Sequence, residues 1–131
     1  MVVIMIDTCF LIDYQRESKR QMPGAVVAFL RARPDERLQI SPVAWGEFLA
    51  GFEDENDPFV QFVRDRLDVA PFPSEVASVY RKIYRHLKAG GNLIGGNDLW
   101  IASHAIVLDQ PLVTRNENEF SRVPDLRLLA Y

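Results

Sequence analysis

The sequence predicts an α/β fold in which a parallel sheet of five short strands is covered by helices on both faces. Two observations predict it. Short apolar runs rich in Val, Ile and Leu alternate with longer segments whose apolar residues recur at helical spacing. The first run, residues 2–6, is apolar throughout, as is typical of a strand buried on both faces. Alternation of this kind favours parallel strands joined by helices, here within one domain over residues 1–131.

Proline, glycine and hydroxyl residues mark where the expected elements begin and end. Pro23 and Gly24 separate the first two helices, and Pro34 ends the second. Ser41 followed by Pro42 is a helix start, because the hydroxyl caps and proline suits the first turn. Ser74 is a second expected cap, and Asn97 or Asp98 a third. We expect strands at 2–6, 38–40, 67–70, 112–114 and 126–130, and helices at 8–16, 25–33, 42–51, 58–66, 75–89 and from the cap at 97 or 98 to 108.

Composition excludes several classes of protein. The 15 lysines and arginines against 18 aspartates and glutamates give a net charge of −3, so no overall positive field indicates nucleic-acid binding. The single cysteine, Cys9, excludes an internal disulfide and a cysteine-based zinc site, and we expect it to be a small buried residue. The start has no basic leader, and no uncharged stretch approaches the roughly 18 residues of a membrane span. We therefore expect a soluble, cytoplasmic protein.

Four acidic residues are placed where a binding site is expected. Asp7 follows the first strand, Glu47 lies about one and a half turns into the helix after the second, Asp98 opens a helix, and Glu119 follows the fourth strand in an expected loop. Ligands of open α/β sheets bind beyond the carboxyl ends of the strands, so all four can reach one edge. Clustered carboxylates resist joint ionisation unless a cation neutralises them. An all-oxygen cluster suits Mg²⁺ or Mn²⁺ rather than zinc, and indicates phosphate chemistry.

Each acid also has an ordinary structural interpretation. Asp7 and Asp98 could be helix caps, and Glu119 could be a solvated loop residue. Glu47 is harder to explain, since it is the only charged residue between Arg37 and Glu53 and its helical neighbours are small or apolar. Such a carboxylate either reaches solvent or serves a site. The joint placement of the four acids carries more weight than any one of them.

Four blocks of sequence resemble a PIN domain, and among PIN domains the VapC-type toxins of bacterial and archaeal toxin–antitoxin pairs. The blocks are DTCFLID (7–13), SPVAWGEFLAG (41–51), IGGNDLWIA (94–102) and LVTRNENEF (112–120), in family order over essentially the whole chain. The resemblance implies a three-layer α/β/α sandwich and a metal-dependent endoribonuclease that is homodimeric and held inactive by a cognate antitoxin. It places the acidic quartet at Asp7, Glu47, Asp98 and Glu119, the last often Asp in the family, with Thr8, Asn97 and Asn116 as neighbours that orient the acids.

A basic strip is the candidate surface for RNA. The segment between Glu75 and Asp98 contains no acid, and its helix carries four positive charges on one arc, opposite an apolar arc. The strip is either an ordinary solvated face or a set of phosphate contacts. It consists of Arg81, Lys82, Arg85 and Lys88.

Competing assignments are poorer or remain open. Haloacid-dehalogenase-type phosphatases need a second Asp at the position of Cys9, and dinucleotide binders need a glycine-rich turn after the first strand. A catalytically silent PIN-like module that binds RNA or protein remains an alternative. His86 and His104 are expected to be ordinary surface or boundary residues. An antitoxin segment could bind near Trp45, Phe52, Phe59 or Phe62, which are otherwise core or dimer surface. The RNA target, its cleavage sequence and the number of metal ions are not predicted.

Overall fold

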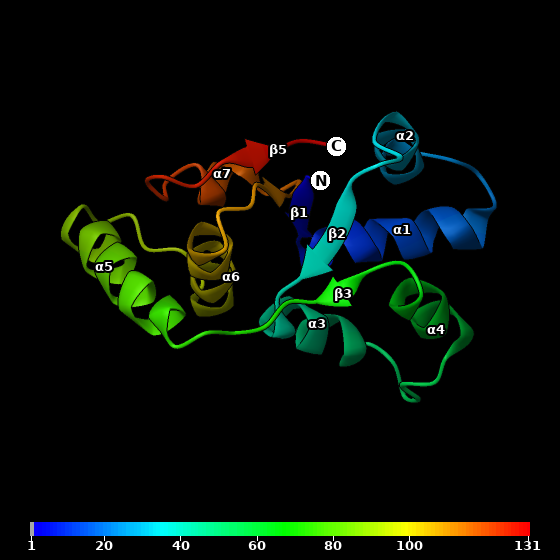
Figure 1. Cartoon of the computed structure of the whole chain (residues 1–131), viewed down its shortest axis with the longest axis horizontal. Coiled ribbons are helices and arrows are strands. Elements are labelled where there is room, and N and C mark those ends of the chain that lie inside the picture. The colour runs from blue at the N-terminus through cyan, green and yellow to red at the C-terminus, as the bar shows by residue number, and fades with distance from the viewer. Residues whose placement is uncertain (1) are drawn as a thin grey trace.

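A computed structural model describes residues 2–131 and contains one five-stranded sheet in which all paired strands are parallel (Figure 1). The order across the sheet is β3-β2-β1-β4-β5. The α/β class and the five-stranded parallel sheet expected from the sequence are confirmed. The strands are β1 (Val3–Ile6), β2 (Arg37–Ile40), β3 (Asp68–Val69), β4 (Leu112–Val113) and β5 (Leu128–Leu129).

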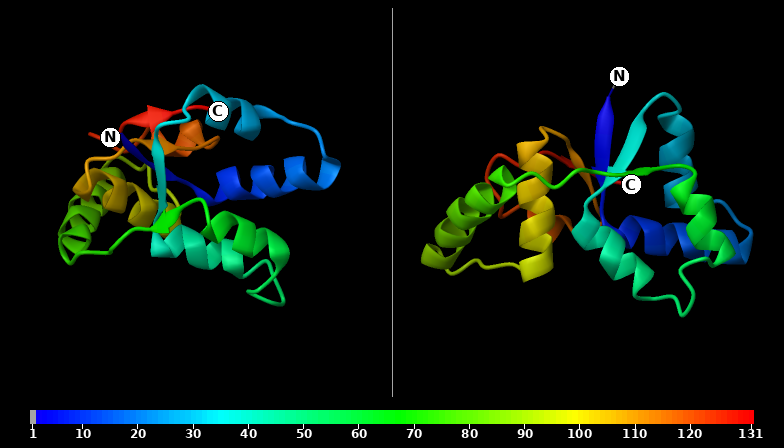
Figure 2. Two further views of the ribbon diagram at one scale, coloured as in Figure 1. Left: turned by 45° about the vertical axis from the view of Figure 1, so that its right-hand side comes forward. Right: turned by 60° about the horizontal axis from the view of Figure 1, so that its bottom comes forward.

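Helices cover both faces of the sheet (Figure 2). Helices α1, α2 and α4 lie to one side of the strands, and α5, α6 and α7 to the other (Figures 1 and 2). No helix within residues 2–131 combines the length and the apolar character of a membrane span. The helices are α1 (Thr8–Arg20), α2 (Ala25–Ala32), α3 (Pro42–Leu49), α4 (Pro58–Arg64), α5 (Glu75–Ala89), α6 (Gly96–Val107) and α7 (Glu117–Phe120).

Strand β1 is the centre of the sheet and of the core. Its residues Ile4, Met5 and Ile6 are fully buried, because helices cover both faces. Ile6 is paired with Ile40 of β2 and with Val113 of β4. The residues that follow these three strand ends are Asp7, Ser41 and Thr114, so the register brings three polar residues to one edge of the sheet.

Helix α3 lies at this carboxyl edge and contacts both α1 and α6 (Figure 1). Its start is as predicted: Ser41 Oγ accepts a hydrogen bond from the Val43 amide at 3.2 Å, and Pro42 occupies the first turn. Ala44, Trp45 and Phe48 are buried, which fixes the rotation of the helix. The opposite face of α3 therefore carries Glu47 to the edge where Asp7 lies.

Several predicted boundaries are wrong. Helix α1 continues to Arg20 rather than ending at 16, and Gln21 closes it in the left-handed conformation at φ 53°. Strands β3 and β5 are only two residues long each. Ser74 occupies the position before α5, but its hydroxyl makes no capping hydrogen bond. The four-residue helix α7 was not predicted at all.

The longer α1 is explained by Glu17, a buried carboxylate that is only 5% exposed. Its two oxygens accept hydrogen bonds from the amides of Gly24, Val26 and Val27 at 2.7, 2.9 and 3.1 Å. Glu17 thus satisfies the free N–H groups at the start of α2. The N-cap residue of α2, Gly24, has no side chain that could do so. A Cβ on Gly24 would lie 2.8 Å from Glu17 Cδ, so this corner requires glycine.

We expect Glu17→Gln to lower the free energy of unfolding by about 1–3 kcal/mol, because an amide can accept fewer of these three hydrogen bonds and carries no charge. Urea denaturation measures the change. Glu36→Gln is the matched control, since among residues 2–131 Glu36 is paired with Arg33 alone. Equal losses in the two variants would contradict the assigned role of Glu17.

Candidate functional site

Asp7 is the residue around which the carboxyl edge is organised. It caps α1, is 5% exposed, and accepts hydrogen bonds from the Thr8 amide at 2.6 Å and from Thr114 Oγ1 at 2.9 Å. Burial raises the pKa of Asp7 above its ordinary value, the negative charge of Glu47 adds to this, and the hydrogen bonds from Thr114 and Thr8 oppose it. Asp7 is both the expected cap and a buried acid at the centre of the site.

Glu47 is exposed and is held by two side chains from other helices. Thr8 Oγ1, at the start of α1, donates to Glu47 Oε1 at 3.0 Å. Asn97 Nδ2, in the first turn of α6, donates to Glu47 Oε2 at 3.3 Å. These two bonds connect α1, α3 and α6 through one carboxylate. Thr8 and Asn97 therefore lie beside the acids, as the resemblance implies.

Asp98 is not the cap that the sequence suggested. Gly95 occupies the N-cap position, and Asp98 is the third residue of α6. The pKa of Asp98 is raised to about 7. Burial is the largest cause; the hydrogen bond with Glu119 and the negative charges of Asp7, Glu119 and Glu47 also raise it. Near pH 7 Asp98 is thus about half protonated.

Glu119 lies in α7 rather than in a loop, which corrects the prediction. Asn116 Nδ2 donates to Glu119 Oε2 at 2.9 Å, and the Asn116 amide donates to Thr114 Oγ1 at 3.0 Å. Since Thr114 also donates to Asp7, a continuous set of hydrogen bonds runs from Asp7 to Glu119. The turn after β4 orients both ends of the acidic group.

The four predicted acids therefore lie at one edge of the sheet and influence one another electrostatically, and this edge with its four acids is called the acidic centre below. No three acidic, histidine or cysteine side chains among the described residues 2–131 are close enough to form a ready-made metal site. The centre nevertheless fits a hard divalent cation in donor chemistry, since all its ligands would be carboxylate oxygens. Burial is the largest cause of the raised pKa of Asp98, and the charges of the other three acids add to it; a bound cation would relieve that repulsion.

Two residues of this edge were not predicted from the sequence. Thr114 is fully buried and orients Asp7, and its place directly after β4 was the available signal. Cys9 is partly exposed rather than buried, and its Sγ lies 3.5 Å from Asp7 Oδ2. Burial and the charge of Asp7 raise the pKa of the Cys9 thiol, which keeps it protonated and unreactive at neutral pH.

The remaining predicted surface residues lie elsewhere. The basic strip is exposed on α5, whose other face packs against α6. His86 is exposed, as expected, but His104 is fully buried, which corrects its prediction. His104 Nε2 lies 2.7 Å from the Pro71 carbonyl oxygen, its ring stacks on Phe72, and burial lowers its pKa. His104 is a structural residue between α6 and the segment after β3.

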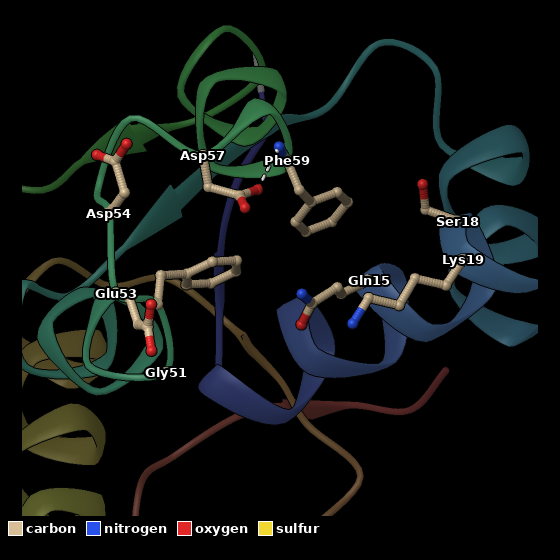
Figure 3. Close-up of a pocket in the computed structure, with 9 residues that line it drawn as sticks. Gln15, Ser18, Lys19, Gly51, Glu53, Asp54, Asp57 and Phe59 are labelled. Atoms are coloured by element: carbon tan, nitrogen blue, oxygen red, sulfur yellow. Dashed lines mark hydrogen bonds between the residues drawn. The ribbon is translucent and has the colours of Figure 1, made fainter.

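A hollow lies away from the acidic centre, between α1 and the segment from the end of α3 to α4 (Figure 3). Its volume is about 490 Å³. Lys19 and Gln15 reach in from α1 and face Phe59 and Asp57 (Figure 3). We call this hollow the α1–α4 groove; it is lined by Gln15, Ser18, Lys19, Gly51, Phe52, Glu53, Asp54, Asp57 and Phe59.

Comparison with known proteins gives a consistent result. The family model of the PIN domain matches residues 4–126. The ribonuclease VapC1 of Haemophilus influenzae (strain R2866) is 30% identical, and the alignment covers 96% of each chain.

Two solved toxin–antitoxin structures have the same fold. VapBC2 of Rickettsia felis, bound to a DNA fragment from the promoter, superposes with a TM-score of 0.85 at 26% identity over 99% of each chain. VapBC-1 of nontypeable Haemophilus influenzae superposes with a TM-score of 0.80 at 29% identity over 98% of each chain.

The stability of the metal-free protein should decrease as pH rises through the range in which Asp98 ionises. The folded-state pKa of Asp98, about 7, lies above its ordinary value of 3.8, so the folded state binds the proton more tightly than the unfolded state. The contribution to stability is full below pH 4 and is lost as pH rises towards 7. Melting temperatures in EDTA between pH 5 and pH 8 measure this decrease.

In Asp98→Asn the decrease should be smaller, and the variant should melt a few degrees above the wild type at pH 8. Asp125→Asn, at an exposed acid outside the acidic centre, should follow the wild-type profile. If the melting temperature of Asp98→Asn depends on pH in the same way as that of the wild type, the raised pKa of Asp98 is refuted.

Proposed function

Because this chain belongs to the PIN domain family, we propose that it is a Mg²⁺- or Mn²⁺-dependent endoribonuclease and the toxin of a type II toxin–antitoxin pair. One observation carries the proposal most directly. Four acids from four separate segments share one edge of the sheet, where burial, a hydrogen bond with Glu119 and the charges of the other three acids raise the pKa of Asp98 to about 7. Unpaired negative charge is unfavourable to stability, and binding of a divalent cation explains why a fold would gather it.

In this proposal Asp7, Glu47, Asp98 and Glu119 hold the metal, which when bound polarises the scissile phosphate and supplies a hydroxide-like water. The rest of the site positions these ligands. Thr114 and the Thr8 amide orient Asp7, and Thr8 Oγ1 and Asn97 orient Glu47.

Asn116 orients Glu119, whose carboxylate shares a hydrogen bond with Asp98. The proton held between Asp98 and Glu119 must leave before both can act as ligands. Lower pH should therefore oppose metal binding.

We propose that the antitoxin binds in the α1–α4 groove. The two solved VapBC structures are toxin–antitoxin complexes, which supports a protein partner of this kind. The groove combines apolar surface from Phe52 and Phe59 with the charges of Lys19, Glu53 and Asp57, as an amphipathic segment requires. Four aromatics were expected near this partner. Trp45 is buried in the core and Phe62 packs against the core, whereas Phe52 and Phe59 line the groove.

Other parts of the assignment stay predictions. We propose that residues 1–131 form one nuclease domain that acts in the cytoplasm, and that the basic strip, Arg81, Lys82, Arg85 and Lys88, gives additional phosphate contacts. A homodimer is also proposed. An apolar hollow of about 330 Å³ that includes Val43, Phe72 and Trp100 is the surface that favours it.

The first test is cleavage of a fluorescence-quenched RNA with Mg²⁺ or with EDTA. We expect the wild type to cleave only with metal, and Asp7→Asn to lose roughly 10²–10³-fold of the rate, because a ligand carboxylate is lost. Asparagine still caps a helix, so the variant should fold.

Asp35→Asn, at an exposed turn residue, is the matched control and should keep full activity. Metal-independent cleavage that Asp7→Asn retains would indicate a contaminating nuclease. RNA binding without any cleavage would favour the silent module.

The second test concerns the partner. We expect Ser18→Trp, which fills the α1–α4 groove from α1, to weaken binding of the protein encoded directly upstream at least tenfold, while cleavage stays unchanged. Ser78→Trp, at an exposed position of α5, is the control. Isothermal titration calorimetry measures both affinities, and equal affinities would exclude the groove.

A further inference from the structure

Arg115 is a basic residue that directly follows a strand end at the carboxyl edge of the sheet. The first two residues after the five strands are Asp7 and Thr8, Ser41 and Pro42, Ala70 and Pro71, Thr114 and Arg115, and Ala130 and Tyr131. Arg115 is the only basic residue in that set. Ligands of open α/β sheets bind at this edge, so a polyanion approaching Asp7 meets Arg115 as its nearest strand-end positive charge.

Arg115 is held at both its backbone amide and its guanidinium. Its amide lies 3.5 Å from Cys9 Sγ, which itself lies 3.5 Å from Asp7 Oδ2. Its Nη1 lies 2.8 Å from Asp13 Oδ2, and Asp13 is six residues, or about 9 Å of helix, beyond Asp7 on α1. The guanidinium therefore lies roughly 9 Å along α1 from Asp7, within the span of a short stretch of single-stranded RNA.

Asp13 is held in turn by a further contact. The Tyr131 hydroxyl donates to Asp13 Oδ2 at 2.7 Å, and the Tyr131 ring packs edge-to-face on Phe10 with centroids 5.1 Å apart. Arg16 Nη1 also reaches Asp13 Oδ1, at 3.4 Å. Two guanidinium groups thus share one carboxylate, so one positive charge is left over at this point on an otherwise acidic edge.

The guanidinium of Arg115 remains available to a ligand. Its side chain is 59% exposed, and only Nη1 has a hydrogen-bond partner within residues 2–131. The remaining N–H groups suit a phosphate, which arginine binds through its planar fork. Asp13, by contrast, is only 14% exposed, so the pair holds the guanidinium at a fixed point while its outer N–H groups face solvent.

We propose that Arg115 binds a phosphate of the RNA next to the one that is cleaved, and that Asp13 and Tyr131 are positioning residues for it. This inference rests on the proposed nuclease function. Arg115 offsets the repulsion between the acidic centre and the RNA backbone, and it sets where along the strand the substrate lies. Its loss should therefore affect substrate binding more than the chemical step.

The chain offers a closely matched control in Arg127. This arginine is 60% exposed, also contacts one aspartate, Asp109 at 3.1 Å, and also adjoins the β4–β5 pair. It precedes β5, however, and so lies at the amino edge of the sheet, away from Asp7. Arg115→Gln and Arg127→Gln remove the same charge from equally exposed arginines at opposite edges.

The experiment measures binding of a fluorescein-labelled, mixed-sequence single-stranded RNA in EDTA at several salt concentrations, and cleavage of the same RNA in Mg²⁺. We expect Arg115→Gln to weaken binding roughly tenfold and raise KM similarly, with kcat within about twofold. The slope of log K against log salt should fall by about 0.7, the value for one phosphate contact on a single strand. Arg127→Gln should change none of these.

Conservative variants separate a phosphate contact from a structural role. Arg115→Lys should restore the salt slope but only part of the affinity, since it keeps the charge without the fork. Asp13→Asn and Tyr131→Phe should raise KM by a smaller factor, at unchanged salt slope. The double variant Arg81→Gln/Arg85→Gln, measured in the same series, shows separately how much the basic strip contributes to RNA affinity and to its salt dependence.

Three results would overturn the inference: no RNA binding by the wild type, equal effects of Arg115→Gln and Arg127→Gln, or a loss in kcat alone. A wild type that binds RNA but does not cleave it refutes the nuclease proposal, and the binding comparison then still decides the role of Arg115.

Discussion

Repulsion among like charges at the carboxyl edge of the sheet is the constraint on which the other features of the acidic centre depend. Asp7, Glu47, Asp98 and Glu119 come from four segments, and the charges of the other three raise the pKa of Asp98. The hydrogen-bond donors that the structure places on Asp7, Glu47 and Glu119 are neutral: an amide, hydroxyls, a thiol and carboxamides. The protein thus orients these carboxylates without neutralising them, which leaves their charge available to a cation.

The parallel sheet is what makes this arrangement possible. Because Ile6 is paired with Ile40 and with Val113, the next residues of three strands meet at one edge. Helix α3 then starts from the second strand and reaches both helical layers, and α6 presents Asn97 and Asp98 from the other side. Each acid comes from a different connection, so the site forms only when the sheet is complete.

The sequence predicted the acids well because their positions depend on strand ends, and strand ends are visible as breaks in apolar runs. Asp7 and Glu47 follow the two clearest strands, and their placement needed only the rule for ligand sites in α/β sheets. Helix α7 was missed because four residues are too few to show helical periodicity. The burial of His104 was missed because it depends on Phe72 and Pro71, which a distant segment brings to it. Asp98 was taken for a cap because Gly95 and Gly96 are poor helix formers, yet α6 begins there.

Helix α3 joins the acidic centre to the α1–α4 groove. Its C-terminal end leads directly into Gly51 and Phe52 on the wall of the α1–α4 groove, and Glu47 lies one turn earlier on the same rigid rod. One short segment, residues 47–52, thus supplies both a carboxylate of the acidic centre and part of the groove wall, so the two surfaces share a single structural element.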